Sequence, residues 1–175
     1  MKRVLMVAAM AALLLGCDDD NDSPTGPSNT GPLVFTSQLS AANEVPPVTN
    51  AEGNGRGSVT ITINVPRDSS GVPTGGGSVN FAVQLSGFPP GTAAVAAHIH
   101  PGAAGVNGGV IVNTGLTAAT AIVMGDGTGT LSFTNVSIPQ DVATNIMNNP
   151  AGFYFNVHTP LNPGGAVRGQ LTRQQ

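Results

Sequence analysis

A length of 175 residues fits one domain rather than two, and 24 glycines, 14 prolines and only 9% charged residues exclude a coiled coil and an ordinary disordered chain. Six Lys and Arg against nine Asp and Glu leave a formal net charge of −3 and no basic cluster, which excludes nucleic acid as a partner. The surplus of Gly, Pro, Thr, Val and Asn is typical of short strands joined by tight turns, so we expect an all-β domain.

Residues 1–16 have the organisation of a bacterial lipoprotein signal peptide. Met1–Arg3 give a positive start, Val4–Leu15 form an apolar stretch, and a small residue precedes Cys17, a sequence that resembles a lipobox. The apolar stretch is shorter than the roughly 20 residues that span a bilayer, which favours cleavage over a membrane-spanning anchor. We expect Cys17, the only cysteine, to become the acylated N-terminus, carrying palmitate or similar chains into the lipid bilayer. The alternative is an ordinary secretory leader followed by a free thiol.

Residues 17–32 are predicted to form a disordered tether behind the acylated cysteine. The segment Asp18–Pro32 is rich in aspartate, proline and glycine and has no large apolar residue that could join a core. Together with Cys17 it predicts an exported, membrane-anchored lipoprotein of the bacterial cell envelope, on either the periplasmic or the outer face.

Residues 33–173 are predicted to form the folded domain, because apolar and polar residues alternate with a period of two from Leu33 onward. Val59, Ile61 and Ile63, for example, are separated by single polar residues. Turn-forming glycine and proline clusters separate the runs. The predicted strands are Leu33–Ser40, Val59–Val65, Val79–Leu85, Thr92–His100, Gly109–Thr114, Ala119–Met124, Gly129–Val136, Gly152–Thr159 and Gly165–Thr172.

The spacing of these strands predicts a two-sheet antiparallel sandwich or a flattened barrel of about eight or nine short strands. One short helix is expected at Gln140–Asn148, since Pro139 stands near its first turn and Pro150 follows its end. We expect this helix to cap one end of the domain.

The alternation also predicts where the three histidines point. Val95, Ala97 and Ile99 form the apolar set of their strand, so His98 and His100 face the other side. By the same reasoning Tyr154, Asn156 and His158 share the polar side of a later strand, and Arg168 lies on the polar side of the last one. If these strands are neighbours, the polar groups converge.

The three histidines permit three interpretations. His98 and His100 are two residues apart on a strand, which places their rings about 7 Å apart on one face. With His158 they offer three nitrogen ligands, the number found in catalytic zinc sites and in some copper sites. Alternatively, the rings form structural hydrogen bonds with Asn156, Thr159 and Arg168, or they carry out acid–base catalysis.

Glu44 is a second candidate site residue, because it stands in a short loop expected to fold over the same end of the domain. It could form an ion pair with Arg168, complete a metal shell as a fourth ligand, or be exposed. The sequence offers no Ser-His-Asp or Cys-His arrangement, so a hydrolase is not expected.

Five segments stand out: Phe35–Pro47, Ala97–His100, Asn107–Gly109, Tyr154–Thr159 and Asn162–Leu171. Taken together, they resemble the CHRD domain. That family is named for chordin, an extracellular antagonist of growth factors, and also occurs in exported microbial proteins. The resemblance implies an extracytoplasmic module and no particular reaction. Two positions depart from the family pattern: Pro101 stands where glycine is frequent, and Ala166 stands where an acid that could pair with Arg168 is common.

The sequence therefore predicts a membrane-tethered, non-enzymatic module that serves in binding or in envelope structure, with an unknown extracytoplasmic protein or small ligand as its partner. The alternative is a metal-binding or redox protein that holds copper or zinc at His98, His100 and His158. The histidine geometry is the sequence feature that discriminates between the two, since a simple binding module has no need for three histidines on one polar face.

Overall fold

The computed structural model describes residues 31–174. The predicted signal peptide, the acylation site Cys17 and most of the predicted tether lie outside the described residues. Among residues 31–174, no helix has both the length and the apolar character needed to cross a bilayer.

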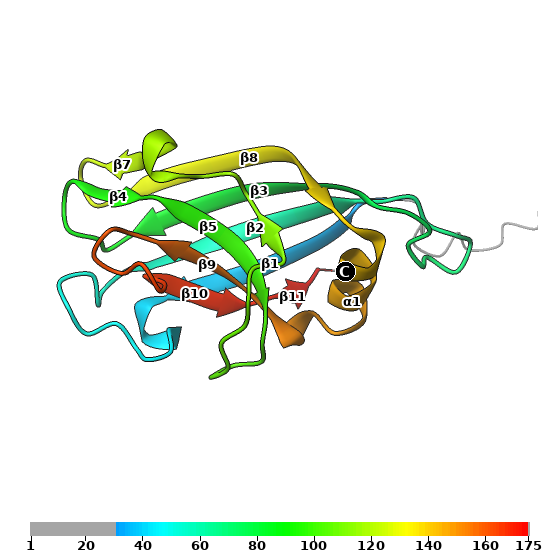
Figure 1. Cartoon of the computed structure of the whole chain (residues 1–175), viewed down its shortest axis with the longest axis horizontal. Helices are drawn as coiled ribbons and strands as arrows, with labels where there is room; N and C mark the ends of the chain where they lie inside the picture. The colour runs from blue at the N-terminus through cyan, green and yellow to red at the C-terminus, as the bar shows by residue number, and fades with distance from the viewer. Residues whose placement is uncertain (1–30, 175) are drawn as a thin grey trace, which may run out of the picture.

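Within the described residues nine strands form one sheet. Eight of them follow the order β6-β5-β9-β10-β1-β2-β3-β8, and β11 also pairs with β1. The end strands β6 and β8 lie near each other without pairing, so the sheet is nearly closed (Figure 1). The predicted all-β, flattened-barrel architecture is confirmed. The strands of this sheet are β1 (Leu33–Ser40), β2 (Arg56–Asn64), β3 (Gly77–Ser86), β5 (Ala96–Pro101), β6 (Val112–Asn113), β8 (Gly129–Ile138), β9 (Phe153–His158), β10 (Val167–Gln170) and β11 (Thr172–Arg173).

The apolar core lies between the two halves of this folded sheet. Ile61 of β2 is directly opposite Phe81 of β3, and both are completely buried, as the alternation predicts. Phe81 also stacks on Phe155 of β9, with ring centroids 5.5 Å apart, although β3 and β9 are not neighbours in the sheet. The sheet therefore curls so that β9 faces β3 across the core. Burial of each such side chain contributes about 1.5–3 kcal/mol.

The predicted helix is confirmed as α1 (Gln140–Asn148), which lies at one end of the molecule (Figure 1). Pro139 occupies its N-cap position, and Pro150 begins the short 3-10 helix η3 (Pro150–Gly152) after it. The other 3-10 helices are η1 (Ala41–Asn43) and η2 (Ala118–Thr120).

Four predicted strands differ from the structure. Thr92–His100 is two strands, because β4 (Thr92–Ala94) pairs with β7 (Ile122–Met124) in a small separate sheet while β5 joins the main one. The predicted strand Ala119–Met124 contains only β7, after η2. The predicted strand Gly109–Thr114 shortens to β6.

The last predicted strand, Gly165–Thr172, is divided at Leu171. β10 pairs with β9 and β1, whereas β11 pairs with β1 alone. The Leu171 N–H donates to the Phe153 carbonyl at this break.

Candidate metal centre

The histidines lie on adjacent antiparallel strands, β5 and β9. In the register of this pair His98 is opposite Asn156, and Ala96 is opposite His158. Because the side chains of alternate residues share one face, all three histidines are on the same side of the sheet. The small side chain of Ala96 leaves space for the His158 imidazole beside the ring of His98. The pairing of β5 with β9 therefore brings the three histidines together, which the sequence predicts only on the condition that these strands are neighbours.

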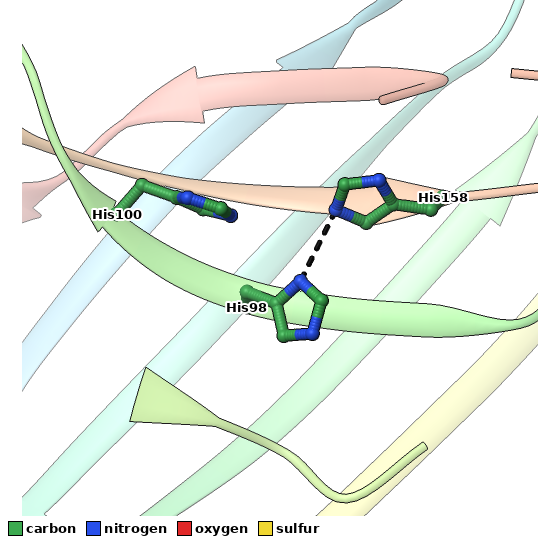
Figure 2. A group of neighbouring side chains, drawn as sticks. All are labelled: His98, His100 and His158. Atoms are coloured by element: carbon green, nitrogen blue, oxygen red, sulfur yellow. Dashed lines mark hydrogen bonds between the residues drawn. The ribbon is translucent and has the colours of Figure 1, made fainter. Parts of the chain in front are cut away.

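The three imidazoles form one cluster (Figure 2). One ring nitrogen from each of His98, His100 and His158 lies within 4.8 Å of the other two. The shortest contact joins His98 Nδ1 and His158 Nε2 at 3.1 Å. Among residues 31–174 no Cys, Asp or Glu belongs to this cluster.

Backbone carbonyls select the tautomers of two of the rings. His100 Nδ1 is 2.9 Å from the Gly108 carbonyl oxygen, and His158 Nδ1 is 3.0 Å from that of Pro163. A carbonyl oxygen only accepts, so each Nδ1 must carry the proton and donate it. In a neutral ring the other nitrogen, Nε2, then carries a lone pair. His100 Nε2 is buried, and no group within residues 31–174 forms a hydrogen bond with it.

The environment keeps two of the rings, His98 and His158, neutral. Burial, together with the neighbouring His158 and His100, lowers the pKa of His98 from 6.5 to about 4. Burial also lowers the pKa of His158, although its bond to Pro163 acts in the opposite direction. At neutral pH both rings are therefore uncharged, with one nitrogen protonated and the other free to bind a metal ion.

Most of the polar face is covered by loops, although His98 is only half-buried. His100 and His158 are 6% and 9% exposed, and Asn156 and Arg168 are 2% and 1% exposed. The prediction that these side chains turn away from the aliphatic core is correct, but loops close over them. One such loop follows β5 and presents the Gly108 carbonyl to His100.

The Tyr154 ring contacts both Arg168 and His100. The guanidinium carbon of Arg168 lies 4.4 Å from the centroid of the Tyr154 ring. The His100 ring is parallel to Tyr154 within 4°, with ring centroids 4.9 Å apart. Cation–π contact offsets part of the cost of burying the guanidinium. The alternation places Tyr154 on this face, but the stacking was not predicted.

The expected ion pair of Glu44 with Arg168 is not formed as a direct contact. Arg168 Nε instead donates to the Asn43 carbonyl at 2.7 Å, and Nη1 donates to Asn107 Oδ1 at 2.8 Å. Arg168 Nη2 and Glu44 Oε1 are both buried, and in the part of the chain that the structure describes neither has a hydrogen-bond partner. The Arg168 guanidinium therefore forms hydrogen bonds with Asn43 and Asn107 and does not pair with Glu44.

Glu44 lies outside the histidine cluster. It lines a cavity of about 290 Å³ between the loops at residues 44–50 and 161–165. Its carboxylate rests against Gly165, where an added Cβ would come within 2.6 Å of both carboxylate oxygens. Burial raises the pKa of Glu44 from 4.5 to about 7, although the positive charge of Arg168 lowers it in part.

Glu52 is a buried site residue that the sequence patterns do not reveal. It is 3% exposed, and its Oε2 accepts from Thr159 Oγ1 at 2.6 Å and from Asn162 Nδ2 at 2.5 Å. Asn162 precedes Pro163, the residue whose carbonyl orients His158. Thr159, predicted as a histidine partner, thus bonds to Glu52. Only tertiary structure joins these residues, because more than 100 positions separate them.

Comparison with known proteins yields one family. A family model described as the CHRD domain matches residues 35–171. The matched segment includes the three histidines, Glu44, Asn156, Thr159 and Arg168. No curated protein matches the chain.

Proposed function

The chain belongs to the CHRD domain family, and from that premise we propose that it is an exported, membrane-anchored module that binds a transition-metal ion, zinc or copper, through His98, His100 and His158. Family membership supports a binding module rather than an enzyme. The metal, the anchor and the location in the envelope are parts of the proposal.

The metal proposal rests on two oriented nitrogen lone pairs, those of His100 Nε2 and His158 Nε2. His100 and His158 each donate Nδ1–H to a backbone carbonyl, the arrangement that metal-ligating histidines almost always show. This leaves Nε2 of each ring as an acceptor inside the cluster. A buried acceptor without a partner costs about 1–3 kcal/mol, a cost that a bound ion would remove at His100.

The donor type and the spacing suit zinc or copper. Imidazole nitrogen is a good ligand for both ions. Tetrahedral bonds of about 2.0–2.1 Å place ligand nitrogens roughly 3.3 Å apart. The contact between His98 and His158 is already 3.1 Å, and no nitrogen of the set is more than 4.8 Å away, so a modest contraction would form the site.

A second candidate function is a metal-free envelope-structural module. The 3.1 Å contact favours it independently, since His98 Nδ1–H donating to His158 Nε2 gives the same distance. In that case the cluster would be an internal hydrogen-bond network that holds β5 to β9.

Metal content of the purified protein separates the two candidates. We expect about one zinc or copper per chain by elemental mass spectrometry, and loss of that metal in a His100→Ala variant. Glu44→Gln is the matched control, since this buried acid lies outside the cluster and its variant should keep the metal. Protein without metal after incubation with either ion, or His100→Ala protein that retains it, would favour the structural module.

A further inference from the structure

We propose that the side-chain oxygen of Asn156 is the fourth ligand of this centre, so that three nitrogens and one oxygen surround the ion and leave no position open to water. This inference rests on the proposed metal binding by the three histidines. It replaces Glu44, the residue that the sequence offers as a fourth ligand.

Asn156 stands in the middle of the site. It lies on β9, two residues before His158 on the same face, and directly opposite His98 on β5. Its side chain is 2% exposed. Asn156 Oδ1 is 3.0 Å from His158 Nε2, the same nitrogen that lies 3.1 Å from His98 Nδ1.

The contact between Asn156 Oδ1 and His158 Nε2 joins two hydrogen-bond acceptors, which points to a cation between them. Because His158 Nδ1–H donates to the Pro163 carbonyl, Nε2 of the neutral ring has only a lone pair to offer. The Asn156 carbonyl oxygen is also an acceptor. Two acceptors at 3.0 Å repel one another unless a proton or a positive ion lies between them or the amide is turned to present its NH₂ group.

The distances agree with shared coordination. Ligands of a tetrahedral ion with bonds of about 2.0–2.1 Å are separated by roughly 3.3 Å. The separations of 3.0 Å and 3.1 Å from His158 Nε2 are close to two edges of such a tetrahedron. The unpartnered Nε2 of His100 then occupies the remaining corner.

A closed shell has a chemical consequence. Zinc sites with four protein ligands are structural, whereas catalytic sites keep one position for water or substrate. A complete N₃O set would hold a tetrahedral divalent ion without activating water. This agrees with a binding module and argues against metal-assisted hydrolysis at this centre.

Cobalt(II) provides a direct test, because its visible absorption reports coordination number and ligand exchange. The full-length protein would be loaded with Co²⁺ and titrated with thiocyanate, which binds open positions. The expected wild-type result is the intense spectrum of four-coordinate cobalt with no change on adding thiocyanate. Asn156→Ala should open the shell, so that its spectrum shifts with thiocyanate, whereas Asn156→Asp should keep an oxygen ligand and remain insensitive.

A thiocyanate-dependent shift in the wild-type spectrum would overturn the assignment of Asn156 even if no variant folds. An Asn156→Ala spectrum identical to wild type, with or without the anion, would do the same. Failure of the metal proposal itself would look different: wild-type protein would give no cobalt spectrum, or His100→Ala would give the same one.

Discussion

The chemistry of the polar face of β5 and β9 depends on the ring nitrogens of His100 and His98. His100 donates one ring nitrogen to Gly108 and keeps the other buried without a partner. Burial and the neighbouring rings hold His98 in its neutral form. Both features leave a nitrogen lone pair available, and the burial of His98 also makes the stability of the metal-free protein depend on pH.

Metal-free protein should lose stability in acid because of these rings. His98 has a pKa of about 4 in the folded chain and an ordinary pKa of 6.5 when unfolded, and the pKa of His158 is shifted in the same direction. Between these values the unfolded chain binds more protons, so the free energy of unfolding falls as pH drops from about 6.5 toward 4. Urea unfolding with a chelator at several pH values measures this dependence, and His98→Gln should flatten it. Equal slopes for the two proteins would contradict the buried neutral ring.

Glu44 should make the stability of the folded chain depend on pH in the opposite direction. Its pKa is raised from 4.5 to about 7, so the folded chain holds the proton more tightly, and stability falls as pH rises from about 4.5 to 7. Glu44→Gln removes this ionisation. We expect the variant to gain stability relative to wild type between pH 5 and pH 8, as measured by the urea midpoint. A difference that stays constant over this range would show that the carboxyl is not buried as described.

At the level of elements, the close approach of β10 to β1 depends on one glycine. A Cβ at Gly169 would overlap the Gln38 carbonyl oxygen and the Ser37 hydroxyl. Gly169→Ala should therefore destabilise the fold by about 1–3 kcal/mol, the usual cost of overpacking. Gly109→Ala is the control, since nothing lies within 4 Å of an added Cβ there, and it should change stability by less than about 0.5 kcal/mol. Equal urea midpoints for the two variants would contradict this packing.

The strands also show how much of the fold the sequence predicts. Alternation in β1, β2 and β3 predicts those strands and their buried faces, because one face of each packs on the core. It does not predict the division of residues 92–100 into β4 and β5, since the two parts keep an extended backbone and differ only in their partners. Short edge strands such as β6 have too few residues to show a period.

The candidate site is also predicted only in part. The shared face of His98, His100 and His158 follows from the two-residue period of their strands. The roles of Glu44, Glu52 and Arg168 depend on loops that meet across the fold, and no local pattern carries that information. For this reason the loop contacts of Arg168 differ from the predicted ion pair with Glu44.

For the whole molecule, the proposed anchor depends on Cys17, which lies outside the described residues. Cys17→Ala removes the sulfur that would carry the acyl chains, so the protein should leave the washed membrane fraction or accumulate as an unprocessed precursor. Ser23→Ala, a change within the predicted tether, should leave the protein on the membrane. Immunoblots of fractionated cells measure both, and full membrane retention of Cys17→Ala protein would refute lipidation.

The central claim is that His98, His100 and His158 hold one metal ion. Anomalous diffraction at the zinc absorption edge, from crystals of zinc-loaded protein, tests it most directly. We predict a single peak inside the cluster, about 2.0–2.1 Å from one nitrogen of each ring. Zinc-loaded crystals without a peak there, with the rings still joined by hydrogen bonds, would contradict the claim.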